Sequence, residues 1–361
     1  MGPDSAVAAV RLGVRRSLAG LEPGALVLAA CSGGPDSLAL AAALAFEAPR
    51  LGLRPGAVTV DHGLQPGSAD QAERVALTLR ELGLDPARRL RVEVAARGEA
   101  AGYPGPEAAA RHARYAAIDA TAVECGAAAV LLGHTMDDQA ETVLLGLARG
   151  SGARSLAGMQ AAAGRYLRPL LEMRRAQTRA ACAALGLDPW DDPQNADPSY
   201  ARSRVRHQVL PLMEEVLGPG ITEALARTAD RLRADADALD AVADEAAERL
   251  MPGWASVHAG GSRAVSAGPG ASGGSPPLAG TGLTLDVAAL AALPGAIRTR
   301  LLRRAAVAFG APAGSLSSAH VRSLDELVTA WHGQRWSDLP GGVRCHRGYG
   351  RLQFTTRPTR Q

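Results

Sequence analysis

The chain has 361 residues, of which 47% are hydrophobic and only 3% aromatic, and its formal net charge is +3. A single hydrophobic core rarely serves more than about 250–300 residues, so this length predicts at least two domains with cores of Ala, Leu and Val. A charge so close to zero does not select a class of partner. All of the 39 residues in the Lys+Arg total are arginine, whose forked guanidinium suits phosphate groups.

The four cysteines lie far apart, and none belongs to a C-x-x-C pair: Cys31, Cys125, Cys182 and Cys345. This spacing argues against a zinc ribbon, an iron–sulfur cluster and a disulfide framework, and it is typical of a reducing compartment. Residues 1–5 lack the charged and apolar regions of a signal peptide, and no apolar run approaches the length of a membrane span. We therefore expect a cytoplasmic protein that does not bind membranes.

Four short apolar runs predict strands, and segments rich in Ala, Leu and Arg at helical spacing lie between and after them. The strands are expected at residues 26–30, 57–60, 90–94 and 128–132, and the helices at 38–46, 69–82, 107–124 and 137–148. Alternating strands and helices predict an α/β fold with a doubly wound, mostly parallel, Rossmann-like sheet. Ligands of such sheets bind beyond the carboxyl ends of the strands.

The first strand leads into a glycine-rich turn and then a helix. Adjacent glycines leave the amide groups of the turn uncovered, and the start of the helix adds unpaired N–H donors, so the turn predicts a phosphate site. It is not a Walker A loop, because that motif requires a lysine and the chain has none. An ordinary turn is the alternative, but the serines and the aspartate favour phosphate, and Asp36 offers a carboxylate to Mg²⁺. The expected phosphate-binding residues are Ser32, Gly33, Gly34, Pro35, Asp36 and Ser37.

Polar residues also follow the second strand and recur on the third predicted helix. Asp61 and His62 either orient the ribose or adenine of a nucleotide or cap the next turn, and the sequence leaves both interpretations open. Arg111 and Arg114 either belong to a solvated helix face or point into the ligand crevice. An arginine there would offset the charge that develops on an α-phosphate as pyrophosphate departs.

The fourth strand is followed by a cluster of ionisable side chains. Asp137 and Glu141 are one helical turn apart, and Asp138 lies beside them. The helix dipole favours carboxylates at a helix start, which accounts for Asp137 and Asp138 but not for His134 or Glu141. Such a cluster is suited to bind Mg²⁺, or to receive an ammonium group and take its proton.

The remaining chain predicts further parts. We expect a catalytic domain over residues 1–217, a helical connector over 218–258 with one long helix at 221–251, and a flexible Gly/Ser/Pro-rich segment over 259–282. A small helical or α+β domain is expected over residues 283–361, with helices at 296–309 and 318–332 and a hairpin around 341–342.

Several segments in chain order resemble the tRNA(Ile)-lysidine synthetases, a branch of the pyrophosphatase-loop ATPase family. They are residues 32–37 (SGGPDS), 60–64 (VDHGL), 110–115 (ARHARY), 133–142 (GHTMDDQAET), 149–152 (RGSG), 168–171 (RPLL) and 190–206 (WDDPQNADPSYARSRVR). The resemblance covers about the first three-fifths of the chain, and residues 293–304 look like the small helical domain that follows the catalytic one in this family. It implies a catalytic domain of the adenine nucleotide alpha-hydrolase type.

The resemblance implies that ATP activates O2 of the wobble cytidine in an isoleucine tRNA with a CAU anticodon. Pyrophosphate leaves, free L-lysine attacks C2 of the adenylated base, and AMP is expelled to give lysidine. In this scheme the glycine-rich turn holds the phosphates with Mg²⁺ on Asp36, and Arg111 and Arg114 lie near the α-phosphate. His134, Asp137 and Glu141 recognise the lysine ammonium, and one carboxylate relays its proton.

Arginines beyond the catalytic motifs are candidates for contacts with the tRNA backbone. They are Arg202, Arg204, Arg206, Arg298, Arg300, Arg303 and Arg304. Arginines that solvate helix faces are the alternative at each position. The rival functions are another ATP-dependent ligase or tRNA-modifying enzyme of the same loop class, and a non-catalytic ATP-dependent RNA-binding protein. A homodimer also stays open.

Overall fold

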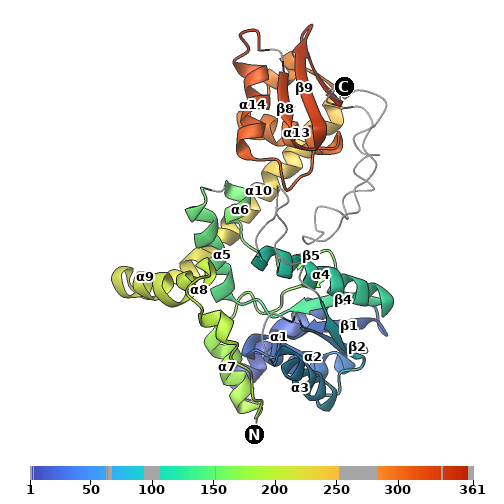
Figure 1. Cartoon of the computed structure of the whole chain (residues 1–361), viewed down its shortest axis with the longest axis vertical. Coiled ribbons are helices and arrows are strands. Elements are labelled where there is room, and N and C mark those ends of the chain that lie inside the picture. The colour runs from blue at the N-terminus through green and yellow to red at the C-terminus, as the bar shows by residue number, and fades with distance from the viewer. Residues whose placement is uncertain are drawn as a thin grey trace. The chain divides into compact units, whose positions relative to one another are not determined.

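The computed structural model describes residues 2, 4–61, 63, 67–92, 106–150, 152–251, 283–334 and 336–356, and for residues 106–110 and 194 it describes the backbone alone. The chain forms two compact units, with the boundary between Arg233 and Ala234 (Figure 1). This boundary falls inside one continuous helix, α10 (Ile221–Leu250), whereas the sequence predicts a boundary at 217/218 and a separate connector. The predicted flexible segment at 259–282 lies outside the described residues.

The first unit is built on a six-stranded sheet in the order β3-β2-β1-β4-β6-β5. The strands β1 to β4 are parallel to their neighbours, and the short β5 is antiparallel to β6. The bounds are β1 Leu26–Ala30, β2 Arg54–Asp61, β3 Ala87–Arg91, β4 Ala127–Leu132, β5 Ala162–Ala163 and β6 Tyr166–Leu167. The predicted α/β class with a mostly parallel sheet is therefore confirmed.

Helices cover both faces of this sheet because alternate strand residues point to opposite sides. Val27 and Ala29 of β1 pack in a core with α1, α2, α3 and α7, whereas Leu26 and Leu28 pack in a second core with α4 (Figure 1). The main helix bounds are α1 Ser5–Leu18, α2 Pro35–Glu47, α3 Ser68–Glu81, α4 Pro106–Glu124, α5 Met136–Ala148 and α7 Arg175–Ala184.

Shorter helical segments complete the first unit. They are η1 Pro49–Leu51, α6 Ala153–Leu156, η2 Pro193–Ala196, α8 Ala201–Arg204, η3 Val205–Val209 and α9 Leu210–Leu217. The segment η3 is a π-helix between two α-helical stretches, a distortion that often occurs at functional sites. It follows α8 directly, so residues 201–217 form a nearly continuous helical run. Within this run, α8 and η3 pack against α5.

The second unit packs helices on one face of a four-stranded antiparallel sheet in the order β7-β10-β9-β8. Its core is apolar and includes Leu301, Leu324, Cys345 and Phe354. The bounds are β7 Thr284–Asp286, α12 Val287–Ala291, α13 Gly295–Ala308, α14 Ser318–Thr329, β8 Trp336–Leu339, η4 Pro340–Gly342, β9 Val343–Gly348 and β10 Arg351–Thr356. The predicted helices and hairpin are thus present.

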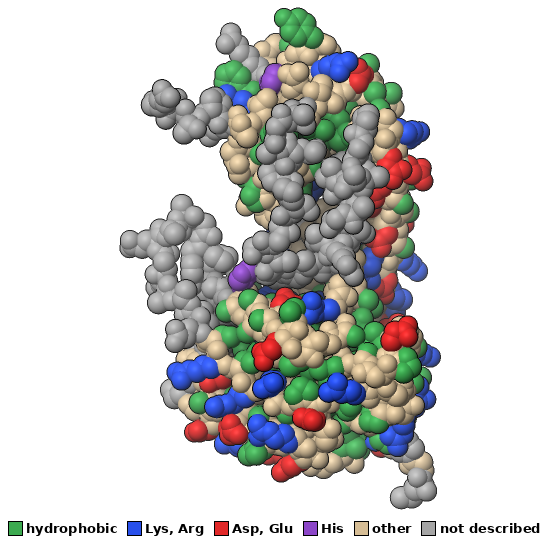
Figure 2. Space-filling view, turned by 90° about the vertical axis from the view of Figure 1, so that its right-hand side faces the viewer, with side chains coloured by type: hydrophobic (Ala, Val, Ile, Leu, Met, Phe, Trp, Pro, Cys, Tyr) green, Lys and Arg blue, Asp and Glu red, His purple; other side chains and the backbone are tan. Residues whose placement is uncertain are grey.

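The molecule's surface does not concentrate arginine on the face that Figure 2 shows. Arginine and carboxylate side chains are interspersed there among apolar and neutral ones. In the part of the chain that the structure describes, no helix combines the length and the apolar character needed to cross a membrane. The polar motifs predicted from the sequence lie at the carboxyl ends of β1 and β4.

Candidate active site

The turn between β1 and α2 exposes backbone donors. Gly33 has φ +87°, and a Cβ atom added there would lie 2.6 Å from Cγ2 of Val75, so only glycine fits. Gly34 is the N-cap of α2, yet no side chain caps this helix. The first amide groups of α2 thus lack the usual side-chain acceptor, which is the arrangement that binds phosphate at helix starts.

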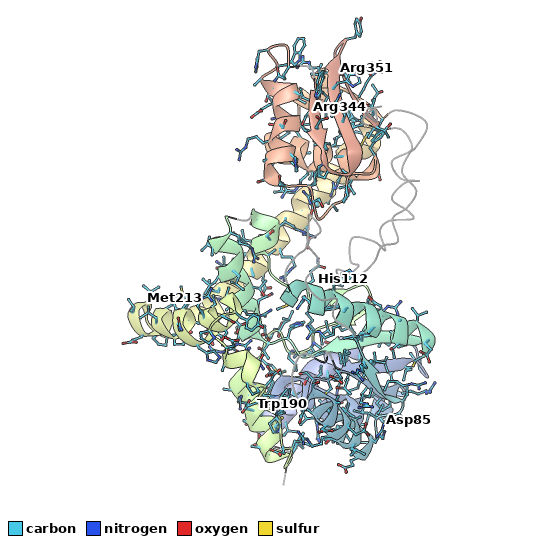
Figure 3. The ribbon with its side chains drawn as sticks, viewed as in Figure 1. Asp85, His112, Trp190, Met213, Arg344 and Arg351 are labelled. Carbon is cyan, nitrogen blue, oxygen red and sulfur yellow. The ribbon has the colours of Figure 1, made fainter. Side chains whose placement is uncertain are left out.

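Serine hydroxyls and a neighbouring loop hold this turn in place. Oγ of Ser37 accepts from the amide of Ser32 at 3.2 Å and donates to the carbonyl of Gly34 at 2.9 Å. The amide of Trp190 donates to the carbonyl of Gly33 at 2.9 Å, and Figure 3 shows Trp190 in the loop after α7. The predicted phosphate-binding residues 32–37 therefore form one preorganised turn.

Gly133 brings the ends of β1 and β4 into contact. A Cβ atom added at Gly133 would lie 3.0 Å from the amide nitrogen of Ser37 and 3.1 Å from the carbonyl carbon of Asp36. Backbone therefore packs on backbone, and a side chain at this position would separate the phosphate turn from the segment that begins α5. The two motifs that the sequence predicts at strand ends are neighbours for this reason.

The start of α5, unlike that of α2, is capped by its own side chains. Oδ2 of Asp138 accepts from the amide of Thr135 at 2.8 Å and from its hydroxyl at 2.9 Å. This capping box occupies one oxygen of Asp138. The other oxygen, Oδ1, faces a group of arginines.

Three guanidiniums converge on the carboxylates of Asp138 and Glu141. We call this set the arginine–carboxylate cluster; its members are Asp138, Glu141, Arg175, Arg202 and Arg206. Nη2 of each arginine lies 3.1–3.2 Å from Oδ1 of Asp138. Nε of Arg202 and Nε of Arg206 each lie 2.7 Å from an oxygen of Glu141, whose side chain is 0% exposed.

Arg175 also reaches the phosphate turn. Its Nε lies 3.3 Å from Oδ2 of Asp36, while its Nη2 lies 3.4 Å from Oε1 of Glu141. The hydroxyl of Thr178, one turn further along α7, donates to the other oxygen of Asp36. A single guanidinium therefore bridges the carboxylate of the glycine-rich turn and the carboxylates of α5.

Asp137 lies beside the cluster but contacts a different part of α7. Its Oδ2 accepts from the amide of Arg175 at 2.8 Å, and its Oδ1 lies 3.4 Å from Nε of Arg174. Arg174 in turn contacts Glu223 at 2.6 Å. The start of α7 is thus tied to the start of α5 through Asp137.

Burial and charge set the protonation states here. Burial alone would raise the pKa of Asp138, but the guanidiniums of Arg175 and Arg202 lower it to about 2. Burial lowers the pKa of His134 to about 3, so its imidazole is neutral at physiological pH. Burial raises the pKa of Asp36, and the hydroxyl of Thr178 and the charge of Arg175 oppose that rise.

Arg111 and Arg114 lie beside a buried tyrosine of α4. The guanidinium carbons of Arg111 and Arg114 lie 4.9 Å and 5.9 Å from the ring centroid of Tyr115, and Arg111 donates to the Tyr115 hydroxyl at 3.2 Å. Burial and the neighbouring charge of Arg111 lower the pKa of Arg114. Within the described ranges, Nδ1 of His134 and Nε of Arg168 are buried without a hydrogen-bond partner.

The other predicted site residues fall in different surroundings. Oδ1 of Asp61 accepts from the amide of Gly63 at 2.9 Å, which is the turn-capping arrangement, while His62 lies outside the described residues. Arg204 is exposed and donates to the carbonyls of Pro198 and Ser199. Arg202 and Arg206, which are also predicted as tRNA contacts, contribute to the arginine–carboxylate cluster.

The four predicted arginines of the second unit bond to neighbouring helices or to the loop after α13. Arg298 pairs with Asp325 of α14 at 2.6 Å, and Arg300 and Arg304 contact Asp240 of α10 at 3.1 Å and 3.4 Å. Arg303 donates to the carbonyls of Leu316 and Ala313. Their guanidiniums are therefore engaged within the protein, a function that helical spacing alone did not reveal.

Sequence reasoning missed Arg174, Arg175 and Thr178. The one local signal was the Arg-Arg pair at 174–175, shortly after the motif at 168–171. Nothing local indicates that Arg175 contacts Asp36, which precedes it by 139 residues.

Comparisons with known proteins agree with this geometry. Residues 14–213 match the family model described as the PP-loop domain, and residues 285–353 match the TilS substrate binding domain. The U34-tRNA thiolase NcsA from Methanococcus maripaludis, a solved structure with a [4Fe-4S] cluster, has a TM-score of 0.51 and 20% identity over 63% of this chain and 79% of that one. This likeness concerns the fold alone. The chain is thus an ATP-binding protein of the PP-loop class.

Curated relatives narrow this class. The tRNA(Ile)-lysidine synthase of Thermobifida fusca is 58% identical over 351 residues, which are 97% of this chain and 98% of the relative. The enzyme of the same name from Streptomyces coelicolor is 52% identical, over 98% of this chain and 99% of the relative. The chain belongs to the tRNA(Ile)-lysidine synthase family of ligases.

Proposed function

We propose that the protein joins free L-lysine to C2 of the wobble cytidine of a tRNA(Ile) with a CAU anticodon, through an adenylated cytidine. The observation that carries the proposal is the contact at Gly133, which sets an uncapped glycine-rich helix start beside a cluster of buried carboxylates. One half of that arrangement suits a triphosphate, and the other half suits a cation.

The turn at 32–37 would hold ATP by its phosphates. The uncapped amides of α2 supply donors, and the hydroxyls of Ser32 and Ser37 lie 3.3 Å apart beside them. Asp36 fits Mg²⁺, which is commonly bound by one or two carboxylates together with substrate phosphates and waters. Among the described residues, no group of three or more His, Cys, Asp or Glu side chains could hold a metal ion. Phosphate oxygens and waters would therefore supply the other ligands of Mg²⁺. When bound, Mg²⁺ neutralises charge on the departing pyrophosphate.

In the first step, O2 of the cytidine attacks the α-phosphorus, the bond to the β-phosphate oxygen breaks, and pyrophosphate leaves. Negative charge then grows on the α- and β-phosphates. Arg111 and Arg114 are suited to offset it, because Tyr115 packs beside both guanidiniums and no carboxylate of the described residues forms an ion pair with either. Burial and the like charge of Arg111 lower the pKa of Arg114, so a phosphate beside them would favour the charged guanidinium.

In the second step, the lysine ε-amine attacks C2, the bond from C2 to O2 breaks, and AMP leaves with that oxygen. The amine must first lose a proton, since only the neutral form is nucleophilic. Asp137 and Glu141 are the candidates to bind the ammonium and relay the proton, with neutral His134 nearby. Glu141 and Asp138 already bind guanidiniums. An entering ammonium would therefore replace one of these guanidinium contacts with another positive charge.

Two properties of the whole chain are compatible with this chemistry. The chain contains no lysine, so no ε-amine of its own competes with the substrate. The four cysteines are free, as expected for enzymes of a reducing compartment, and we place the reaction in the cytoplasm. Arg204 and the second unit are the proposed contacts with tRNA.

The test is incorporation of radiolabelled lysine into a tRNA with a CAU anticodon, with and without ATP. We expect label only with ATP, and AMP and pyrophosphate as products. Release of ADP and phosphate instead would contradict the proposal. Glu141→Gln separates the steps: it is expected to keep pyrophosphate release and to abolish lysine transfer. Equal loss of both, in a variant whose melting temperature is unchanged, would reject the assignment of Glu141 to lysine.

A further inference from the structure

Among the described residues, helices cover one face of the sheet of the second unit, and no helix packs on the other face. Leu339, Val343, Cys345, Leu352 and Phe354 are buried and point to the helices. The residues that alternate with them point the other way. They are Trp336, Asp338, Arg344, His346, Arg351, Gln353 and Thr355, and we call them the open sheet face.

Strand register places these side chains next to one another. His346 is opposite Trp336 on β8 and opposite Gln353 on β10. Arg344 is opposite Asp338, and Arg351 is opposite Gly348. Figure 3 shows Arg344 and Arg351 on this sheet. An aromatic ring, an imidazole, an amide and two guanidiniums thus occupy one continuous surface.

The exposed tryptophan is unusual for this chain, which is only 3% aromatic. Three aromatic side chains among the described residues are largely exposed: Trp331, Trp336 and Tyr349. All three lie in one stretch of the second unit, residues 331–349. Trp336 is 46% exposed, and it begins the edge strand β8 beside polar side chains of the same face. Single exposed apolar residues are common on protein surfaces, so exposure alone does not distinguish Trp336 from Trp331. What distinguishes Trp336 is its place on one sheet face beside imidazole, amide and guanidinium side chains.

The ring of Trp336 is held in place before any partner arrives. The guanidinium carbon of Arg344 lies 4.5 Å from its centroid, and Arg344 is itself fixed by two contacts with Asp338 at 2.7 Å and 3.1 Å. A preoriented ring loses little freedom on binding. Arg351 is exposed, and no ion pair of Arg351 is found among the described residues.

The geometry points to the open sheet face as a binding surface for an unpaired nucleotide of the substrate tRNA, with its base stacked on Trp336 and a phosphate at Arg351. An exposed ring beside cationic and amide groups on an antiparallel sheet is an arrangement that binds single-stranded RNA. A protein partner would require a wider apolar area than one tryptophan. This inference rests on the proposed function, because it names the surface that holds the same substrate.

The inference also moves the expected tRNA contacts within the second unit. Arg298, Arg300, Arg303 and Arg304 are engaged with α10, α14 and nearby carbonyls, whereas Trp336 and Arg351 are not required for packing. Substitutions on the open sheet face should therefore change RNA affinity without changing stability.

The experiment measures equilibrium binding of a tRNA(Ile) transcript to the full chain by fluorescence anisotropy. Trp336→Ala should weaken binding about tenfold or more, and Trp336→Phe, which keeps a stacking ring, should recover most of it. Arg351→Ala should weaken binding and reduce the slope of log affinity against log salt by about one. Melting temperatures should stay at the wild-type value.

Two matched controls lie away from this face. Trp331→Ala removes an equally exposed tryptophan that is associated with Arg347, which points to the helix side. Arg322→Ala removes an exposed charge of α14. Both should bind tRNA as the wild type does. Wild-type affinity of Trp336→Ala, or equal losses in Trp336→Ala and Trp331→Ala, would overturn the inference.

The possible failures can be told apart. If the wild type neither binds tRNA nor incorporates lysine, the proposed function fails. If the wild type does both and Trp336→Ala is unchanged, only the inference fails. A change in oligomeric state of Trp336→Ala, measured by light scattering at unchanged tRNA affinity, would show that the face contacts a second copy and would equally overturn it.

Discussion

The two units use the same side chain, arginine, in different ways. In the first unit three guanidiniums share the carboxylates of Asp138 and Glu141 at the ends of parallel strands. In the second unit Arg298 pairs with Asp325 and thereby joins two neighbouring helices. Shared partners let an incoming ligand replace one contact without leaving a charge alone, whereas a pair between helices mainly fixes packing. The way in which arginines share their carboxylate partners therefore distinguishes a candidate ligand site from a structural contact better than the number of arginines does.

Removing a shared carboxylate should have the largest effect. Glu141→Ala leaves three part-buried guanidiniums without their fully buried carboxylate partner, and we expect the first unit to lose about 3–5 kcal/mol of its free energy of unfolding. Hydrogen exchange resolved by peptide measures each unit separately. A loss below about 1 kcal/mol would show that the cluster does not depend on Glu141, and the distinction between the units would weaken.

The matching change in the second unit should cost less. Arg298→Ala removes the contact with Asp325 at 2.6 Å and a hydrogen bond to the carbonyl of Leu293 at 2.9 Å. We expect the second unit to lose about 2–3 kcal/mol, with exchange in the first unit unchanged. Arg322→Ala, at an exposed position of the same unit, should stay within about 0.5 kcal/mol of the wild type. Equal effects of the two substitutions would contradict a scaffold role for Arg298.

Helix caps offer a milder comparison of the units. Thr135 begins α5 with a buried capping box, and Ser317 begins α14 with an exposed one. Thr135→Ala should cost about 1–2 kcal/mol, because it also loosens Asp138 within the cluster, and Ser317→Ala about 0.5–1 kcal/mol. Thermal unfolding of both variants tests this order, and a larger loss at Ser317 would reverse it.

The effect that is smallest at neutral pH is the one that depends on the protonation of His134. The pKa of His134 is about 3 in the folded protein and about 6.5 in an unfolded chain, so the unfolded state binds an extra proton between these values. Stability should therefore fall as the pH drops below about 6.5. His134→Gln removes this titrating group, so between pH 7 and pH 5 the variant should lose about 2 kcal/mol less of its free energy of unfolding than the wild type does. Parallel melting curves from pH 7 to pH 4.5 would show no difference if His134 were exposed.

Local patterns were sufficient to predict the elements and the strand-end motifs. The parallel sheet, the glycine-rich turn and the α5 cluster follow from apolar runs and from residues adjacent in the chain. The edge strand β3 was expected at 90–94 but spans 87–91, because its Ala-Arg-Arg-Leu-Arg sequence is half exposed and its apolar signal is weak. The amphipathic helix α1 was not predicted, although it packs against α2 and α7.

Partners brought together by folding could not be predicted. Arg175 contacts Asp36 and Glu141, and Arg202 and Arg206 contact Glu141, across separations of 34 to 139 residues. The sequence therefore identified the carboxylates of the candidate site but not the guanidiniums that bind them. For the same reason, arginines expected to contact tRNA proved to be engaged within the chain.

The position of Arg175 has a thermodynamic consequence. One guanidinium serves Asp36 on one side and Asp138 and Glu141 on the other. A ligand that weakens or strengthens the contact between Asp36 and Arg175 also changes how strongly this guanidinium interacts with Asp138 and Glu141. Reciprocity then requires that occupancy of either side shift the affinity of its neighbour by the same factor. If nucleotide and lysine bind as proposed, each would therefore change the affinity of the protein for the other.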